Sequence, residues 1–294
     1  MRRRFWKIVF LIIQYLGLFR ILTFTKNDNA NILFVLGMFR SGTSLTSKLL
    51  EQLGLPLNKD WRLLKAVGNL AILNPEGFRE DFLFAQVSRF WFEKLNRSGD
   101  NPPTPEEVAK FKAQPIRLDE FINFSETVGR DNRISNLNRL RCYLLLLFVG
   151  DRAFVNNSKQ IQIKIPMLTP FYEQLLRWYP NSKYLIVIRN PDATIVSSKK
   201  LTENSNIDLY NRYYIHLYNL FQKHRTITQI ISYDDLLENS KLTIQGLKYK
   251  YNLQGQPASV IRKDLIRSPI KLESKNSYYD YLLKEAFNKN ISEE

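Results

Sequence analysis

Short apolar runs alternate along this chain with longer stretches in which apolar residues recur at helical spacing. The runs at 31–36 (NILFVL) and 183–188 (KYLIVI) are almost continuously apolar. The run at 160–166 (QIQIKIP) alternates, and that at 228–233 (TQIISY) is apolar at its centre. Runs of this length, bounded by polar residues, predict four strands with buried faces.

Helical patterns follow each predicted strand. Leucines recur at helical spacing between Leu45 and Leu53, and Gly54 ends that pattern. Before the second predicted strand we expect a helix ending near Leu95, a helix that opens with the Thr104–Glu107 capping box, and a mostly helical stretch over 117–150. After it we expect a helix from Thr169-Pro170 to about Tyr179, and a helix capped by Asn190 with Pro191 at its first position. The remaining expected helices are Tyr210–Phe221, one from Asp234 that Asp234 or Asp235 caps, and one from Ser277.

Strands that alternate with helices predict an α/β fold, a P-loop-like parallel sheet flanked by helices. The first crossover is very long, from about residue 54 to 160, so we expect a long helical insertion after the first strand–helix unit. The expected organisation is an N-terminal apolar and basic helix (1–25), followed by a single α/β domain (30–294). Loops at the carboxyl ends of the strands carry the site in such sheets.

The N-terminal segment is apolar, but Lys7, Gln14 and Arg20 interrupt it. Three interpretations stay open: a helix at the membrane interface, a signal anchor, or a helix packed on the domain. The single cysteine, Cys142, excludes an intrachain disulfide and favours a reducing compartment. We therefore expect a cytoplasmic, membrane-associated protein, with a single-pass membrane protein as the alternative.

The net charge of +15 favours anionic partners. No block of basic residues resembles a nucleic-acid-binding arm, so nucleic acid is not an expected partner. A membrane surface contacted by residues 1–24 remains compatible with the charge.

Residues 37–44 (GMFRSGTS) follow the first predicted strand. Gly37, Gly42 and Ser44 match the P-loop pattern, but Thr43 stands where the phosphate-binding lysine belongs. A glycine turn that enters a helix N-terminus directs backbone N–H groups to one point, and Arg40 adds a full positive charge. The loop is thus a candidate anion site that lacks the lysine that ATP enzymes use.

A second candidate anion site follows the strand at 183–188. Arg189 ends that strand, and Ser197 lies on the next helix. An arginine and a serine can hold a phosphate jointly, because the planar guanidinium makes paired hydrogen bonds. We expect one ligand with two anionic ends, one at Arg40 and the other at Arg189 and Ser197.

At these residues the chain resembles the sulfotransferase superfamily, whose members use 3′-phosphoadenosine 5′-phosphosulfate (PAPS). The RSGTS of residues 40–44 is similar to the family's 5′-phosphosulfate loop, and RNP at 189–191 with Ser197 is similar to its 3′-phosphate motif. NPEGFRE at 74–80 is similar to a motif of the bacterial carbohydrate-type branch, and YDDL at 233–236 to another family motif.

The resemblance implies a role for each matched residue. Residues of the first loop would bind the 5′-phosphosulfate, namely Arg40, Ser41, Gly42, Thr43 and Ser44. Arg189 and Ser197 would hold the 3′-phosphate. No metal is expected, because arginines and backbone N–H groups stand where a kinase uses Mg²⁺.

The expected chemistry is sulfuryl transfer to a hydroxyl group or amine of a carbohydrate or lipid-linked acceptor. Arg40 would stabilise the leaving phosphate, and Glu80 is the candidate general base, with Asp81 or Glu76 as substitutes. Lys164 is a third candidate catalytic residue, assigned to charge stabilisation. Two alternatives stay open: a P-loop-type kinase that uses ATP, and a membrane-associated nucleotide-binding protein without catalysis.

Aromatic residues near Glu80 have two interpretations. Phe78, Phe82, Phe90 and Trp91 could line an acceptor cleft or belong to the core. The basic residues of the tail, Arg262, Lys263, Arg267 and Lys271, have no confident match to the family.

Overall fold

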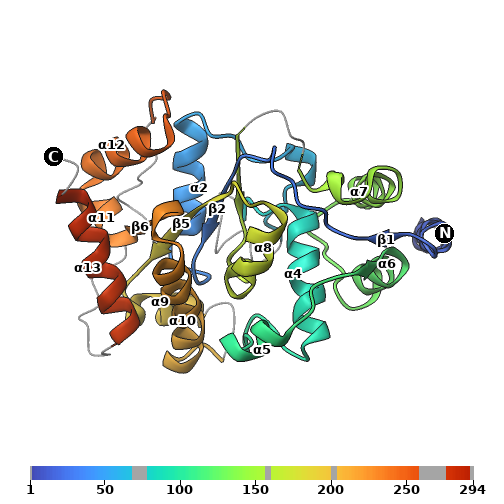
Figure 1. The fold of residues 1–294 in the computed structure, drawn as a ribbon. Helices are drawn as coiled ribbons and strands as arrows, with labels where there is room; N and C mark the ends of the chain where they lie inside the picture. The colour runs from blue at the N-terminus through green and yellow to red at the C-terminus, as the bar shows by residue number, and fades with distance from the viewer. Residues whose placement is uncertain (1, 68–77, 156–159, 200–203, 258–275, 292–294) are drawn as a thin grey trace.

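The structure, a computed structural model, describes residues 2–67, 78–155, 160–199, 204–257 and 276–291 (Figure 1). At its centre is a four-stranded parallel sheet in the order β4-β2-β5-β6. The strands are β2 (Ile32–Leu36), β4 (Ile161–Lys164), β5 (Lys183–Ile188) and β6 (Thr228–Ser232). All four predicted strands are confirmed, although β4 is shorter than its pattern because Pro166 opens a 3₁₀ turn after it.

The strand register aligns the carboxyl ends of the strands along one edge of the sheet. Val35 of β2 pairs with Lys164 of β4, and Ile188 of β5 pairs with Ser232 of β6. Because all strands are parallel, the segments that leave β2, β4, β5 and β6 emerge on the same side. This edge therefore gathers residues that are far apart in sequence.

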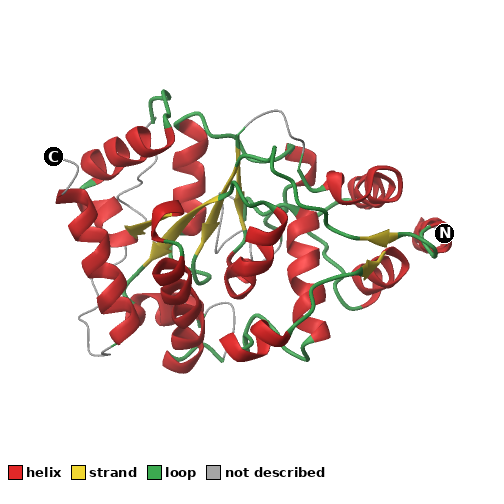
Figure 2. Ribbon diagram, viewed as in Figure 1, coloured by secondary structure: helices red, strands yellow, loops and turns green. Residues whose placement is uncertain are grey.

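Alternate side chains of the strands face two separate hydrophobic cores. Leu33 and Val35 point to one core, and Phe34 points to the other. Helices cover both faces (Figure 2). The first face packs against α2 (Thr43–Gln52), α11 (Tyr233–Glu238) and α12 (Ser240–Tyr251), and the second against α4 (Phe82–Lys94), α8 (Tyr172–Trp178), α10 (Ile207–Lys223) and α13 (Ser277–Ile291).

The described part of the β2–β4 crossover is largely helical, which confirms the predicted insertion. After α2 and α4 it contains α5 (Pro105–Lys110), α6 (Leu118–Thr127) and α7 (Asn136–Val149). The capping box at the start of α5 is confirmed: the Glu107 N–H donates to Thr104 Oγ1 at 3.3 Å, and the Thr104 N–H donates to Glu107 Oε2 at 2.8 Å.

The N-terminal helix α1 (Arg2–Leu16) packs against α6 and α7. Phe10 and Ile13 are buried there, and the Phe10 ring lies 5.8 Å from that of Tyr143. The short strand β1 (Ile21–Leu22) then pairs with β3 (Ile116–Arg117) just before α6. None of the helices in the described residues is both long and apolar enough to cross a membrane.

Two local predictions are wrong. The helix expected from Thr169 begins only at Tyr172, because a 3₁₀ turn (Pro166–Phe171) precedes it and Thr169 bonds instead to the loop after β2. Helix α11 is capped by Ser232, whose Oγ accepts the Asp235 N–H at 3.4 Å, and not by an aspartate. Asp234 instead accepts the Asn190 N–H at 3.3 Å.

Candidate active site

The loop between β2 and α2 has two residues in the left-handed backbone region. Arg40 has φ 68° and Gly42 has φ 99°. A Cβ atom at Gly42 would lie 2.2 Å from Tyr233 Cδ2, so only glycine fits against that ring. The loop is therefore pressed against the segment that leaves β6.

Hydrogen bonds from outside the loop fix its start. The Gly37 N–H donates to Thr169 Oγ1 at 3.2 Å, and Thr169 Oγ1 donates to the Gly37 carbonyl at 3.0 Å. Ser41 is fully buried, and its Oγ donates to the Met38 carbonyl at 2.7 Å. The Ser41 side chain thus shapes the loop.

Helix α2 begins at Thr43, with Gly42 as an N-cap that supplies no side-chain hydrogen bond. The first N–H groups of a helix have no partner within the helix, and the dipole adds about half a positive charge there. Thr43 is buried and Ser44 is half-buried beside them. This end of α2 therefore has the donors that an anion requires.

The predicted anion ligands from the two halves of the chain meet. Arg40 Nε donates to Ser197 Oγ at 3.0 Å. Arg189 Nη1 donates to the Arg40 carbonyl at 3.1 Å. Two guanidinium groups and a serine hydroxyl therefore lie at the carboxyl ends of β2 and β5, close enough to serve one small ligand.

The backbone of Arg189 is held by tyrosines of α10. Its N–H donates to Tyr214 Oη at 3.1 Å, and its carbonyl accepts from Tyr210 Oη at 2.8 Å. The guanidinium lies 4.5 Å from the centre of the Tyr233 ring, a cation–π distance. Its Nε is buried and has no hydrogen-bond partner within the described part of the chain. A buried unpaired donor of this kind fits a position for a bound anion.

Ser197 lies on α9 (Pro191–Ser198), whose start matches the prediction. Asn190 caps the helix, because its Oδ1 accepts the Ala193 N–H at 3.2 Å, and Pro191 takes the first position. Ser197 is 5% exposed. Thr194, one turn earlier, has a buried hydroxyl that finds no hydrogen-bond partner among the residues the structure describes.

On the β4 side of the loop, Glu80 and Lys164 form an ion pair. Lys164 Nζ lies 3.0 Å from Glu80 Oε1, and Arg133 Nη1 lies 3.9 Å from Glu80 Oε2. Lys164 is 2% exposed, and this burial lowers its pKa, although the Glu80 carboxylate opposes the shift. Glu80 is thus a carboxylate between two cations at the same edge as Arg40.

Asp81 is not available as a substitute base, which corrects the expectation from sequence. It is buried, and its Oδ1 caps α4 by accepting the N–H groups of Leu83 and Phe84 at 3.0 and 3.3 Å. The same oxygen lies 2.8 Å from Arg62 Nη2. The other proposed substitute, Glu76, lies outside the described residues.

Several further predictions also fall outside the described residues. These are Asn74, Pro75 and Gly77 of the carbohydrate-branch motif and the basic residues Arg262, Lys263, Arg267 and Lys271.

The aromatic residues near Glu80 separate into two groups. Phe82, Phe90 and Trp91 belong to the core, with exposed fractions of 0, 5 and 0%. The Phe78 ring instead lies 4.7 Å from the Arg133 guanidinium. Phe78 therefore contacts the Glu80 cluster through Arg133, whereas the other three rings are buried in the core.

Arg133 is a residue that the sequence analysis missed. Asp131 holds it in a bidentate pair, with Arg133 Nε 2.9 Å from Oδ1 and Nη2 2.7 Å from Oδ2. Its proximity to Glu80 arises from the tertiary fold. The Leu64 N–H donates to the Glu80 carbonyl at 2.8 Å, and the Lys65 N–H donates to the Arg133 carbonyl at 2.9 Å, so residues 64–65 join the two segments. No local spacing pattern indicates this contact.

The order of the strands sets the order of the groups. Glu80 and Lys164 lie on the β4 side, the Arg40 loop leaves β2, and Arg189 leaves β5. If an anion lies between Arg40 and Arg189, Glu80 and Lys164 lie beyond Arg40, on the side of the loop away from Arg189. The arrangement can therefore bind a negatively charged group at the two arginines and place the Glu80 carboxylate near the end of that group that faces β4.

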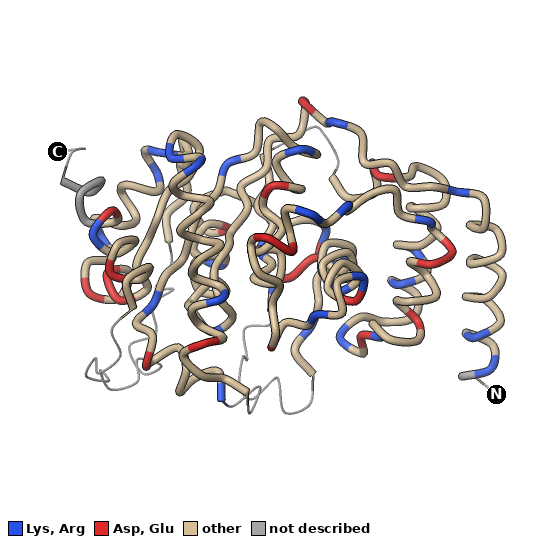
Figure 3. The backbone as a smooth tube through the Cα atoms, turned by 60° about the horizontal axis from the view of Figure 1, so that its bottom comes forward, with Lys and Arg blue, Asp and Glu red and all other residues tan. Residues whose placement is uncertain are grey.

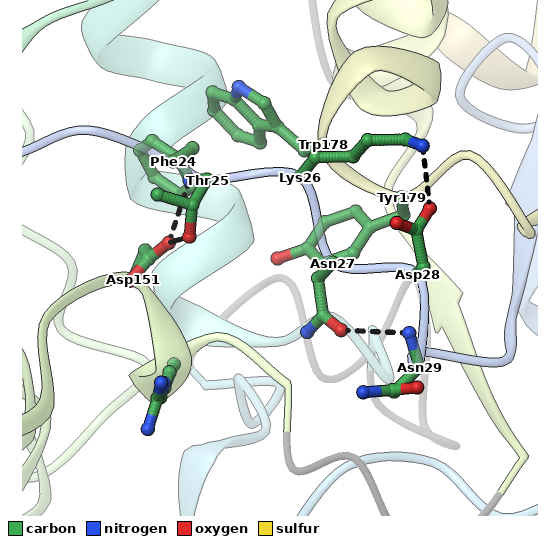
Figure 4. A pocket seen from close by; sticks show the side chains of 10 residues that line it. Phe24, Thr25, Lys26, Asn27, Asp28, Asn29, Asp151, Trp178 and Tyr179 are labelled. Atoms are coloured by element: carbon green, nitrogen blue, oxygen red, sulfur yellow. Dashed lines mark hydrogen bonds and ion pairs between the residues drawn. The ribbon is translucent and has the colours of Figure 1, made fainter.

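A polar cavity of about 250 Å³ lies elsewhere, near the amino ends of the strands (Figure 4). The labelled side chains come from the segments before β2, β4 and β5. Thr25 bonds to Asp151 Oδ2 through its N–H and its hydroxyl, at 2.9 and 3.0 Å. The Phe24 and Trp178 rings stack with centres 3.5 Å apart. This cavity is therefore separate from the Arg40 site.

Comparison with known proteins gives a sequence match and several remote structural neighbours. The sequence model of the sulfotransferase family matches residues 33–254. No curated protein matches the chain.

Similar solved structures include a sulfotransferase of Mycobacterium tuberculosis, with 13% identity over 76% of this chain and 68% of that chain and a TM-score of 0.38. The sulfotransferase domain of a Synechococcus olefin synthase has 13% identity over 89% and 94% of the two chains, with a TM-score of 0.45. A sulfotransferase of Mycobacterium avium has 15% identity over 91% and 76%, with a TM-score of 0.38.

Proposed function

The chain belongs to the sulfotransferase family, and we propose that it transfers a sulfuryl group from PAPS to a hydroxyl group, or an amine, of a carbohydrate or glycolipid. One observation carries the donor assignment: Arg40, Arg189 and Ser197 are joined by hydrogen bonds of 3.0 and 3.1 Å. PAPS has two anionic ends on one adenosine, and this cluster offers two arginines to them. The carbohydrate acceptor rests on the resemblance of residues 74–80 to the carbohydrate-type branch.

The positions of the residues support a donor-binding role for each. Arg189 and Ser197 would hold the 3′-phosphate, and the buried unpaired Nε of Arg189 supports an anion there. The start of α2, from Gly42 to Ser44, would bind the 5′-phosphosulfate through backbone N–H groups. Arg40 would balance the negative charge that develops on the leaving phosphate oxygen.

On the acceptor side, Glu80 would take the proton of the attacking hydroxyl group. The acceptor oxygen forms a bond to sulfur, the bond between sulfur and the phosphate oxygen breaks, and the electron pair leaves with the phosphate. Lys164, 3.0 Å from Glu80, would orient the carboxylate and stabilise charge on the transferred group. PAPS supplies the activated sulfuryl group, and the protein supplies position and charge.

Ligand binding tests the donor. The midpoint temperature of thermal unfolding should rise with 3′-phosphoadenosine 5′-phosphate. At a hundredfold excess of nucleotide over Kd, the free energy of unfolding should increase by about 2.7 kcal/mol. A shift with ATP·Mg²⁺ and none with the 3′-phosphate nucleotide would overturn the assignment in favour of a kinase.

Transfer of label tests the reaction and finds the acceptor. Radiolabelled PAPS is incubated with the protein and fractions of a host lysate, together with a panel of carbohydrates and glycolipids. Glu80→Gln should lower the transfer rate by about 10²–10⁴-fold without weakening nucleotide binding. Glu120→Gln is the matched control, since Glu120 lies on α6 and forms an exposed ion pair with Lys94 at the end of α4. Nucleotide binding without transfer to any fraction would support a binding protein instead.

A further inference from the structure

Helix α1 is apolar on two opposite sides, and the domain covers only one of them. Phe10 and Ile13 are buried against α6 and α7, and a Cβ atom at Gly17 would lie 3.2 Å from Leu118 Cγ. This side belongs to the core of the protein. A helix with a single apolar stripe would have a polar face on the outside.

The outward side of α1 is instead apolar and exposed. Its large side chains and their exposed fractions are Ile8 58%, Leu11 53%, Ile12 53% and Tyr15 75%. The exposed apolar surface continues with Phe19, which is 90% exposed, and Ile21, which is 53% exposed. Scattered apolar residues are normal on protein surfaces, but a continuous row along one helix marks an interaction surface.

The charges of this segment have one sign. Residues 1–27 carry Arg2, Arg3, Arg4, Lys7, Arg20 and Lys26 and no acidic residue. Arg4 and Lys7 are exposed in the first turns of α1, and Figure 3 shows α1 at the outer edge of the molecule with its basic residues toward the N-terminal end. Juxtamembrane basic residues contribute about 1 kcal/mol each to binding of anionic lipid surfaces.

We propose that α1, through Ile8, Leu11, Ile12 and Tyr15, docks the protein on an anionic lipid bilayer, with the helix axis along the membrane surface. An exposed apolar face flanked by arginine and lysine is the pattern of an interfacial helix. A second copy of this chain fits the face less well, because its own basic residues would approach and the face carries no acidic residue to pair with them. This inference does not depend on the proposed sulfuryl transfer.

Vesicle flotation with the full chain tests the proposal. The vesicles are phosphatidylcholine alone, or phosphatidylcholine and phosphatidylglycerol in equal parts. The wild type should float with the anionic vesicles, and added salt should weaken the binding. The triple variant Ile8→Gln/Ile12→Gln/Tyr15→Gln should lose about tenfold or more of the binding.

Leu242→Gln/Tyr249→Gln is the matched control, since these α12 residues are exposed to similar fractions of 57 and 81%. It should float like the wild type. Phe19→Ser, at a 90% exposed position beyond α1, is a second variant that leaves the helix itself unchanged and should also weaken flotation. Thermal unfolding checks that each variant is folded.

Three results would overturn the proposal. One is no flotation of the wild type with anionic vesicles, and another is equal flotation of the wild type and the triple variant. The third is that light scattering shows a dimer for the wild type and a monomer for the triple variant, while neither protein floats with the vesicles. That outcome would assign the face to contact between copies.

Discussion

Arg40 Nε donates a hydrogen bond to Ser197 Oγ at 3.0 Å, although 157 residues separate them in sequence. The contact joins the loop after β2 to helix α9, which follows β5. Arg189 adds a second link through its 3.1 Å bond to the Arg40 carbonyl. The two candidate anion sites are therefore parts of one cluster, as a ligand with two negative ends requires.

The first prediction concerns selectivity for the 3′-phosphate. Arg189→Gln should weaken binding of 3′-phosphoadenosine 5′-phosphate by about 10- to 150-fold, because a charge-assisted hydrogen bond contributes ~1.5–3 kcal/mol. Binding of 5′-AMP, which lacks the 3′-phosphate, should change little. Calorimetric titration of both nucleotides measures the difference.

Arg212→Gln is the control. Arg212 lies on α10 and donates an exposed hydrogen bond to Asn101 Oδ1. If Arg189→Gln weakens the binding of both nucleotides equally, Arg189 acts on the loop through the Arg40 carbonyl and does not bind the 3′-phosphate.

The second prediction concerns the glycine turn. Gly42→Ala places a Cβ atom 2.2 Å from Tyr233 Cδ2 at a φ of 99°. The backbone conformation alone costs about 1–2 kcal/mol for a residue with a side chain, and the clash adds to it. Thermal unfolding should show a clear loss of stability, and nucleotide binding should be lost with the loop geometry.

A second glycine supplies the contrast for that measurement. Gly246 lies inside α12, where a Cβ atom would meet nothing within 4 Å. Gly246→Ala should stabilise the protein by about 0.5–1 kcal/mol, since alanine loses less entropy in a helix. Equal effects of the two substitutions would contradict the role assigned to the turn.

Features fixed by sequence neighbours could be predicted. The strands depend on apolar runs, and the caps at Asn190 and Thr104 depend on residues three positions away. The cap at Asp81 leaves the same kind of signal, an aspartate directly before a helix, but that signal does not distinguish a helix cap from a catalytic carboxylate. Local patterns thus predicted the sheet, most of the helices and the positions of the two candidate anion-binding loops.

Features fixed by tertiary contacts could not be predicted. Thr169 belongs to a 3₁₀ turn because it exchanges hydrogen bonds with Gly37, 132 residues away. Arg133 meets Glu80 only because two distant segments lie together. Neither relationship leaves a periodic pattern in the sequence.

The third prediction separates the neighbouring carboxylates. Asp81→Asn removes one partner of the buried pair with Arg62, and leaving a buried charge unpaired costs about 3–5 kcal/mol. Glu80→Gln should lower the free energy of unfolding by less than Asp81→Asn does, because the buried Lys164 can lose its proton whereas Arg62 cannot, while the transfer rate falls. Denaturant unfolding of both variants gives the comparison. A stable Asp81→Asn variant with a low transfer rate would assign catalysis to Asp81.

The last prediction concerns the alkaline limb of the transfer rate. Burial lowers the pKa of Lys164 below its ordinary value of 10.5, so the cation is lost at a lower pH than that of an exposed lysine. If the Lys164 cation stabilises the transferred group, the rate falls as pH rises through this pKa. Rates measured across the alkaline range should therefore decline before 10.5, and Lys164→Met should be slow and lack the limb.

The ion pair with Glu80 allows a second test of whether Lys164 causes the alkaline fall in rate. The Glu80 carboxylate, 3.0 Å from Nζ, raises the pKa of Lys164 against the larger effect of burial. Glu80→Gln removes that charge, so the limb of the residual activity should move to lower pH. If the pH of the alkaline fall does not change in Glu80→Gln, the titrating group is not Lys164. Lys164 would have lost the carboxylate that raises its pKa, and nothing else in the variant replaces that charge.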